Sequence, residues 1–567
     1  MTDEKLNEYA LSAAQTRKAP VRRRPRLLEF ATLIISLIVA VPLIAIVWIA
    51  FSAGTEDLVH LANTVLPRSL GRTLALLALI SLATAVTGIL TAWLTVTFDF
   101  PLRKLLSVAL VLPLAMPTYL AAYADTEFFD YSGPLQSGIR ALFGFKTPRD
   151  YWFPDIRTLY GAVFVMGAVL YPYVYLSCRS MFLLQGRSAA DVARTLGASP
   201  LKVFFTVQLP MARPAIAAGL ILVMMETLND IGAVEYLGVN TLTFAIYDTW
   251  LNRGSLGGAA QIAAVMLVFV GLLILLERHA RRRQRFTGTK STSIVHSAAR
   301  IPIKGWKKYA ATIFCICPVA AGFLVPGGVL AGYASRRLES LLSAELLNGL
   351  KNTILVAGLT AAITVVVGFI IAYSARVGRG RLASGMARFA TFGYGVPGTV
   401  LAIGVLIPLA ALDNQISGFL RQNFGISTGL IMSGTMIAII YALSCRFLTM
   451  AEGTVEAGFH KLPTSLDHAS RTLGHSGAYT LRAILIPVMR PAVLTAALLV
   501  FIETIKELSA TILLRPFNFN TLATLVYEDA SRARVEDAAI PALIIVLAGL
   551  VPVVLVSRSL DRARDGE

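Results

Sequence analysis

Long apolar runs separated by short polar stretches dominate the chain. Each run is close to the roughly 20 residues that an α-helix needs to cross a bilayer. The pattern therefore predicts an all-α polytopic membrane protein with about 12 transmembrane helices. We expect the spans at about 30–51, 69–97, 104–125, 157–179, 212–236 and 256–277 in the first half, and at about 309–333, 348–375, 386–412, 426–446, 488–513 and 537–557 in the second.

The two halves carry the same sequence pattern. The stretch from Ser188 to Asp230 returns at Asp467–Glu507 in one register of 277 positions, and flanking residues such as Thr73 and Thr353 match at 280. The matched pairs include Arg194–Gly197 with Arg471–Gly474, Pro210 with Pro487, Glu226 with Glu503, and Pro117 with Pro397. Because each half has an even number of spans, both halves have the same orientation. The chain is therefore predicted to contain two parallel six-helix repeats.

Basic residues next to the spans set the expected orientation. They concentrate before the first span, in the linker between the halves and after the last span, and short loops rich in Lys and Arg usually stay in the cytoplasm. Both termini are thus expected to be cytoplasmic. The expected segments are a basic tail at 1–29, a first repeat at 30–277, a basic linker at 278–308, a second repeat at 309–557 and a tail at 558–567, with repeated cytoplasmic loops at 188–210 and 467–487.

Composition agrees with a membrane protein and excludes several other classes. Of 567 residues, 56% are hydrophobic and 15% are charged, and the mean hydropathy is +0.68. The net charge of +18 does not indicate a nucleic-acid partner, because the basic residues flank the spans, where membrane lipid is the partner. The sequence lacks G-x-x-x-x-G-K-[ST] and other catalytic motifs, so we expect no enzyme activity and no bound cofactor. A metal-ligand set cannot be identified.

The repeated loops are amphipathic and too charged for the hydrocarbon region. A short helix is expected from about Ala189 to Leu196, ended by Gly197, and Pro210 and Pro487 are expected to break the chain where each loop enters the next span. Two such loops on one face would suit a symmetric cytoplasmic partner. The alternative interpretation is a simple surface loop, which does not explain why a charged loop is duplicated.

This loop resembles the EAA loop of permease subunits of ATP-binding-cassette importers that are served by a periplasmic binding protein. The resemblance covers nearly the whole chain and implies a multi-pass protein of the bacterial inner membrane. It implies as partners two copies of a cytoplasmic ATPase, which uses ATP and magnesium, and a periplasmic substrate-binding protein. By position, the residues that couple to the ATPase are Asp191, Val192, Ala193, Gly197 and Pro210 in the first loop, and His468, Ala469, Ser470, Gly474 and Pro487 in the second.

The loops depart from the family pattern at one position. Asp191 stands where the family usually has Glu, and His468 takes that place in the second loop. Whether the neighbouring Asp467 substitutes for the missing acid is open at this point. The two loops are therefore not expected to be equivalent.

Sequence downstream of each loop most resembles ferric-iron permeases of the fused two-half type. The resembling stretches include Glu226–Gly232 and Lys506–Thr511. Permeases for thiamine, phosphonate and polyamine carry related sequence and remain alternatives. The resemblance implies transport by alternating access, coupled to a separate ATPase. An ion-driven secondary transporter is a further alternative, but it leaves the two cytoplasmic loops unexplained.

Four acidic residues are candidates for a substrate path. Glu226 and Asp230 are four positions apart and would share a face of the fifth span, and Glu503 and Glu507 would do the same in the eleventh. Ionisable residues within spans usually face a bundle interior or a water-filled path. Oxygen ligands at such a place would attract a hard, highly charged cation. Alternatively, the acids pair with basic neighbours such as Lys506 or lie at the outer water interface.

Overall fold

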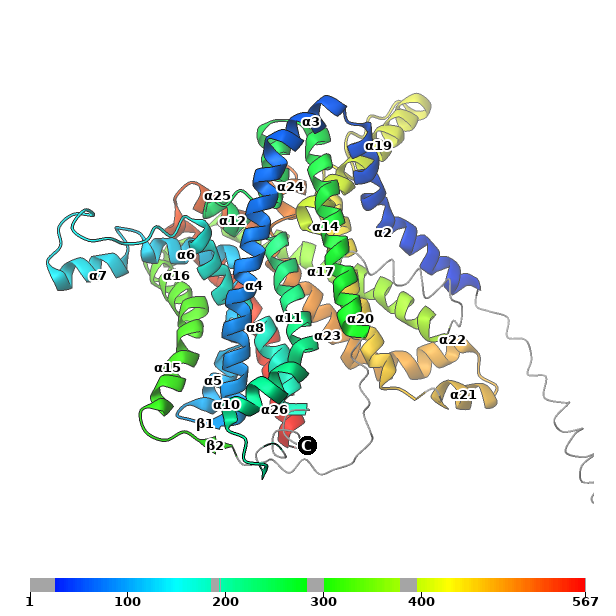
Figure 1. Cartoon of the computed structure of the whole chain (residues 1–567). Coiled ribbons are helices and arrows are strands. Elements are labelled where there is room, and N and C mark those ends of the chain that lie inside the picture. Colours follow the sequence, from blue (N-terminus) through cyan, green and yellow to red (C-terminus); the bar gives the residue numbers. More distant parts are fainter. Residues whose placement is uncertain are drawn as a thin grey trace, which may run out of the picture.

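The computed structural model describes residues 26–184, 193, 195–282, 300–377, 395–463 and 465–565. Helices make up its regular structure, apart from a parallel pair of two-residue strands, β1 (Phe98–Asp99) and β2 (Ile301–Pro302). The long helices form one bundle, with α3 at one end and the C-terminus at the other (Figure 1). Eleven described helices are long and apolar enough to cross a membrane, or up to 12 if a bent pair is one span, which confirms the predicted fold class.

The first half follows the predicted spans except at the third and the fifth, since the helix predicted at 212–236 runs over Pro200–Asn229 and ends before Asp230. Its helices are α2 (Arg26–Ser52), α3 (Thr55–Asn63), α4 (Val65–Thr97), α5 (Arg103–Ala109), η1 (Leu112–Ala115), α6 (Thr118–Phe129), α7 (Pro134–Phe143), α8 (Leu159–Leu184), α10 (Pro200–Val203), η2 (Phe204–Gln208), α11 (Leu209–Asn229), α12 (Gly232–Tyr236), α13 (Leu242–Tyr247), η3 (Asp248–Asn252) and α14 (Leu256–Arg282). The predicted continuous span at 104–125 is wrong, since the chain bends by 99° between Ala115 and Thr118. Pro117 drives Met116 into an extended conformation (φ −93°, ψ 111°), which ends the helix.

The second half repeats this order with one longer helix. Its helices are α15 (Lys307–Val319), η4 (Ala320–Leu324), α16 (Val325–Arg336), η5 (Leu338–Leu342), α17 (Ala344–Val377), α19 (Gly398–Phe424), α20 (Met436–His460), α21 (Ser465–Thr472), α22 (Gly477–Tyr479), η7 (Thr480–Leu485), α23 (Ile486–Ile505), α24 (Thr511–Leu514), α25 (Leu522–Ser531) and α26 (Val535–Asp565). The spans predicted at 386–412 and 426–446 are misplaced. Residues 386–394 lie outside the described residues, and α19 continues twelve residues beyond 412.

A buried carboxylate explains the extra length of α19. Asp413 looks like the start of a polar loop in the sequence, yet its side chain accepts hydrogen bonds from the backbone N–H groups of Met432 and Ser433, both at 2.8 Å. These bonds compensate the burial of the charge and fix the loop that leads into α20. Hydropathy alone could not place the end of this helix.

Equivalent residues of the two halves make equivalent contacts. The Thr73 hydroxyl oxygen accepts a hydrogen bond from the Leu242 N–H at 2.9 Å, and 280 positions later Thr353 accepts one from Leu522 at 2.8 Å. Helix α4 packs along α8 in the same way that α17 packs along α20. Where equivalent residues touch each other, they mark the axis that relates the halves.

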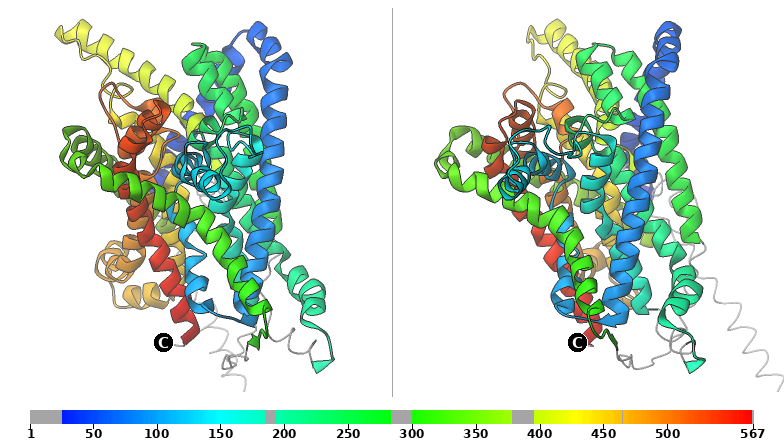
Figure 2. Two further views of the ribbon diagram at one scale, coloured as in Figure 1. Left: turned by 90° about the vertical axis from the view of Figure 1, so that its left-hand side faces the viewer. Right: turned by 60° about the vertical axis from the view of Figure 1, so that its left-hand side comes forward.

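The two halves are interlocked through their first helices. Helix α2 packs against α14 of its own half and against α19 of the other, while α16 packs against α26 of its own half and against α6 of the other. Figure 2 shows the segment α15–α16 leaning across the bundle towards α26 and α6. At one crossing, a Cβ added to Gly404 of α19 would lie 2.3 Å from the Pro42 carbonyl oxygen of α2. Only a glycine permits this approach.

We expect G404A to destabilise the protein, because the new methyl group would meet backbone rather than a flexible side chain. Overpacking of this kind costs about 1–3 kcal/mol of unfolding free energy. The measurement is thermal unfolding of the purified protein in detergent. G358A is the matched control, since no atom lies within 4 Å of a Cβ at that position of α17. Equal melting temperatures for the two variants would contradict the close crossing of α2 and α19.

Candidate functional site

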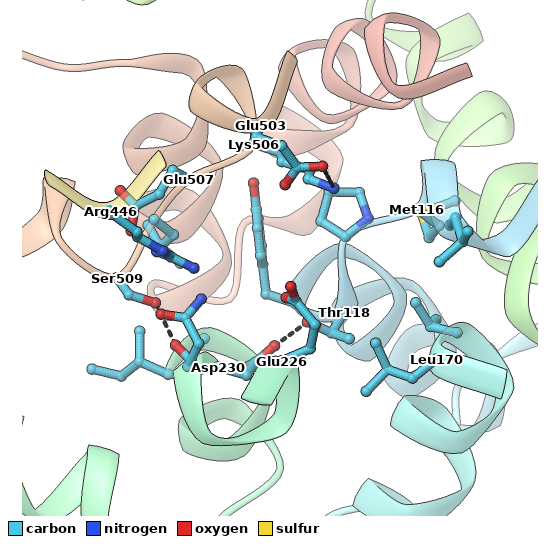
Figure 3. A pocket seen from close by; sticks show the side chains of 18 of the residues that line it. Met116, Thr118, Leu170, Glu226, Asp230, Arg446, Glu503, Lys506, Glu507 and Ser509 are labelled. Atoms are coloured by element: carbon cyan, nitrogen blue, oxygen red, sulfur yellow. Dashed lines mark hydrogen bonds and ion pairs between the residues drawn. The ribbon is translucent and has the colours of Figure 1, made fainter. Parts of the chain in front are cut away.

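A cavity of about 90 Å³ lies where α11 and α23 end. Both halves line it, largely with residues that are separated by 277 positions. These pairs are Val169 with Arg446, Leu170 with Phe447, Glu226 with Glu503, Asn229 with Lys506, Asp230 with Glu507, Ile231 with Leu508, and Gly232 with Ser509. Glu226 and Asp230 lie across the cavity from Glu503 and Lys506 (Figure 3). The duplication has therefore produced one shared site between the halves.

All four predicted acids line this cavity, but two of them do so in an unexpected way. Helix α11 ends at Asn229 and α23 ends at Ile505, so Asp230 and Glu507 follow the helix ends. The predicted shared helical face is thus wrong for both pairs. Helix α11 is followed by an extended residue, Asp230 (ψ 125°), whereas α23 is followed by Lys506, whose backbone is not extended (φ −91°, ψ −1°).

The carboxylates of Asp230 and Glu507 stabilise the chain segments after each break. Asp230 Oδ1 accepts a hydrogen bond from the Ala233 N–H at 2.7 Å, and Oδ2 accepts one from the Thr118 hydroxyl. In the second half, Glu507 Oε1 accepts one from the Ala510 N–H at 2.8 Å, and Oε2 accepts one from the Thr511 hydroxyl at 2.7 Å. Backbone N–H groups at a helix start favour a negative charge. Both acids therefore hold the short helices α12 and α24 in place.

Two cations in the second half neutralise its acids. Arg446 Nη1 lies 2.9 Å from Glu507 Oε1, and Lys506 Nζ lies 2.8 Å from Glu503 Oε1. The expected alternative, pairing with Lys506, is thus correct for Glu503. Sequence reasoning missed Arg446, although an arginine inside an apolar run is itself a sign of a functional site. At the equivalent positions the first half has Val169 and Asn229, so the two sides of the cavity differ in charge.

Polar contacts across the cavity tie the halves together. The Asn229 side-chain oxygen accepts a hydrogen bond from the Gly398 N–H at 2.9 Å, and the Ser509 hydroxyl donates to the Asn229 carbonyl at 2.6 Å. A Cβ added to Gly398 would lie 2.8 Å from the Ala510 nitrogen, so the start of α19 requires glycine here. The start of α19 and the ends of α11 and α23 thus form one unit.

Tyrosines lie beside the cavity and between the two halves. Tyr119 lines it, and ring contacts continue from Tyr119 to Tyr123 at 5.9 Å and from Tyr123 to Tyr236 at 4.6 Å. On the axis between the halves, the hydroxyls of Tyr247 and Tyr527 lie 3.3 Å apart, and these residues are 280 positions apart. Tyr527 also donates to a carboxylate oxygen of Glu235 at 2.7 Å. The two halves therefore meet through a polar contact that links α13, α25 and α12.

The cavity does not hold a ready-made metal site. Within the described part of the chain, no three His, Cys, Asp or Glu side chains are close enough together to bind a metal ion. The four acids instead take part in hydrogen bonds and electrostatic interactions within the protein. Binding of a metal ion would require some of these contacts to be exchanged.

The repeated loops have the same backbone geometry where both are described. Gly197 has φ +84° and Gly474 has φ +83°. The Ala198 N–H donates to the Ala193 carbonyl at 3.1 Å, and the His475 N–H donates to the Ser470 carbonyl at 3.1 Å. This pattern ends a helix with a left-handed residue, as predicted for Gly197. Asp191 and Val192 lie outside the described residues, and Ala469 lies within α21.

The prediction that Pro210 and Pro487 break the chain is wrong. Helix runs unbroken over Pro200–Asn229, a stretch of 30 residues, and over Gly477–Ile505, a stretch of 29. A wider π-helical turn precedes each proline, η2 in the first half and η7 in the second, and it accommodates the missing N–H and the ring. The break comes earlier, at Ser199 and Ser476, whose side chains cap the new helices.

The second loop is anchored by an ion pair. Arg376 at the end of α17 donates to Asp467 Oδ2 of α21 at 2.8 Å and to the Phe459 carbonyl at 2.9 Å. His468, the next residue, is exposed. Asp467 is thus engaged with Arg376 in this structure. The first half has Val96 and Ala190 at the corresponding sequence positions, 280 and 277 residues earlier.

A helical bundle of two parallel repeats, with ionisable groups enclosed between them, defines a membrane transport protein. The family model for the binding-protein-dependent transport system inner membrane component matches residues 10–286 and 364–565. The chain belongs to this family of transport permeases.

One known permease is similar to this chain over nearly its whole length, and others are similar to part of it. The chain is 24% identical to the Fe(3+)-transport system permease protein FbpB 2 of Haemophilus influenzae over 545 residues, which covers 95% of this chain and 99% of the relative. It is 23% identical to the ferric transport system permease protein FbpB of Actinobacillus pleuropneumoniae, covering 71% of this chain and 58% of the relative. A Salmonella choleraesuis permease named for 2-aminoethylphosphonate transport, PhnU, is 29% identical over 42% of this chain and 82% of its own length.

We expect R446M to destabilise the protein strongly, because it leaves the buried Glu507 carboxylate without its cation. Breaking a buried ion pair in this way costs about 3–5 kcal/mol. Thermal unfolding measures the loss, and the double variant R446M/E507Q should recover part of it. R336M is the control, since Arg336 and Glu536 form a solvent-exposed pair at 3.9 Å. A loss no larger than that of R336M would contradict the role of Arg446.

Proposed function

We propose that this permease belongs to an ATP-driven importer of the bacterial inner membrane and that its cargo is ferric iron. The observation that carries the proposal is the shared cavity, in which four carboxylates occupy equivalent positions of the two halves. Ferric iron is a hard cation that prefers such oxygen ligands. The name of the relative that matches 95% of this chain supports the same cargo.

The two repeated loops are the proposed contacts with two copies of a cytoplasmic ATPase. Leu196 and Leu473 occupy the same position of the repeated motif, directly before the glycine. They are 82% and 76% exposed, which suits docking into a partner. Helices α10 and α21 lie towards the same end of the bundle as the C-terminus (Figure 1). The ATPase would use ATP and magnesium, and this chain would bind no cofactor itself. A periplasmic binding protein would deliver the cargo at the opposite end.

The continuous helices Pro200–Asn229 and Gly477–Ile505 are the proposed levers of transport. At about 1.5 Å per residue, each is about 45 Å long. Each begins at a coupling loop and ends at the cavity, beside Glu226 or Glu503. Closure of the ATPases would move the two levers together, and the halves would alternate between outward and inward openings. The contact between Tyr247 and Tyr527 would separate when the outer side opens.

A phosphonate is the second candidate cargo. Arg446 and Lys506 lie beside the acids, so the cavity offers both signs of charge to a molecule with an amine and a phosphonate. In the described part of the chain, Nε of Arg446 has no hydrogen-bond partner and is available to an anion. The similarity to PhnU in part of the chain supports this alternative.

We expect cells with the intact gene to take up radiolabelled ferric iron faster than cells without it. E226Q and E503Q should each lower uptake roughly tenfold, the size of effect seen when a metal contact is weakened. Uptake of labelled thiamine, polyamine and 2-aminoethylphosphonate serves as the comparison. Gene-dependent uptake of one of these, with iron uptake unchanged, would replace the proposed cargo and leave the class of importer intact.

Valine at Gly197 or Gly474 should uncouple ATP hydrolysis from uptake. Both glycines have a positive φ, which costs other residues about 1–2 kcal/mol and should displace the docking loop. The two rates are measured in membrane vesicles that contain the complete importer, after checking that the variant inserts. The control is G271V, because Gly271 of α14 lies outside both loops, is not in the left-handed region and has open space around it. Normal coupling in both variants would argue against the assigned loops.

A further inference from the structure

The cavity carries its cations on one side only. Four carboxylates and two cations line it, and both cations, Arg446 and Lys506, come from the second half. The equivalent positions of the first half hold Val169 and Asn229. The cavity therefore contains its own counter-ions, but fewer than its acids. The inference below rests on the proposed function, because it concerns how a cation leaves this site.

The two cations are held differently. The side chains of Arg446 and Glu507 are 8% and 3% exposed, and the Glu507 carboxylate is also fixed by the Ala510 and Thr511 N–H groups. The side chains of Lys506 and Glu503 are 23% and 26% exposed. A lysine is a compact charge on a flexible four-carbon stem, whereas an arginine is a planar fork suited to fixed pairs. The Lys506–Glu503 pair is thus the exchangeable one.

Lys506 lies beside Glu503 and faces Glu226 across the cavity (Figure 3). It pairs with Glu503 of its own half, and Glu226 of α11 contributes to the electrostatic attraction that it experiences. A cation that enters the cavity must compete with this ammonium group for the same carboxylates. A monovalent ion brings no more charge than the lysine already supplies. A trivalent ion brings three times as much, so it can displace the lysine.

Release poses the opposite problem. A site that conducts must bind its ion well enough to admit it and weakly enough to let it leave. Carboxylates without a counter-ion would hold a trivalent cation too tightly for transport. A cation that is covalently attached to the site cannot diffuse away, and so it returns as soon as a carboxylate becomes free. Lys506 has the charge, reach and partner for this task.

We propose that Lys506 is a tethered competing cation that selects against monovalent ions and promotes release of a trivalent cargo. In the empty cavity it neutralises Glu503. An arriving trivalent cation takes the carboxylate and Lys506 moves aside, still protonated. When the halves open inward, Lys506 pairs with Glu503 again and the cargo leaves. Asn229, the equivalent residue of the first half, cannot do this because an amide carries no charge.

The test compares K506N, which installs the residue of the first half, with the wild type and K506R. Uptake of radiolabelled ferric citrate is measured in cells with the complete importer, and retained iron is measured on the purified importer after gel filtration. K506N should retain roughly tenfold more iron, equivalent to about 1.4 kcal/mol, and transport it roughly tenfold more slowly. K506R should restore most of the uptake, because it keeps the charge.

The control is K351N, which removes an exposed lysine from α17 and should behave as wild type. Iron retention in K506N that equals or falls below that of the wild type would overturn the inference, as would undiminished uptake. If the wild type itself neither takes up nor retains iron, the proposed cargo fails, and this inference falls with it. A loss of both retention and uptake in K506N would make Lys506 part of the binding site instead.

Discussion

The structure depends on how two helix ends are satisfied inside the protein. In lipid, backbone N–H and C=O groups must find partners within the protein, so a helix that stops midway needs a local source of hydrogen bonds. Asp230 and Glu507 supply it by accepting from the segments that follow α11 and α23. The same carboxylates line the cavity. The groups that permit the helices to break are thus also the groups that a cargo would meet.

The interlocked packing limits how the halves can move. Because α2 contacts α19 and α16 contacts α6, neither half can rotate away without carrying a helix of the other. Motion is therefore easier as a small change of angle around the cavity than as a separation of the halves. The Tyr247–Tyr527 contact lies on the axis between them, where such a change of angle affects the two halves equally.

Hydropathy and register were sufficient to predict the helical class, most spans and the convergence of the four acids. They failed where a single side chain determines the backbone conformation or the length of a helix. Pro117 bends the third span, and Asp413 extends α19 because distant N–H groups compensate its charge. Pro210 and Pro487, in the first turns of α11 and α23, looked like breaks, but the π-helical turns before them accommodate the prolines. Arg446 pairs with Glu507 across 61 residues, a partnership that a one-dimensional pattern cannot reveal.

The one-sided placement of Arg446 and Lys506 has a consequence for how such a protein can evolve. A transporter assembled from two identical subunits must carry every substitution twice, so a lysine gained on one side appears on the other. With both copies encoded in one chain, each half can mutate alone while their ratio stays fixed at one to one. Gene fusion thus permits a charge balance in the central cavity that a homodimer cannot reach.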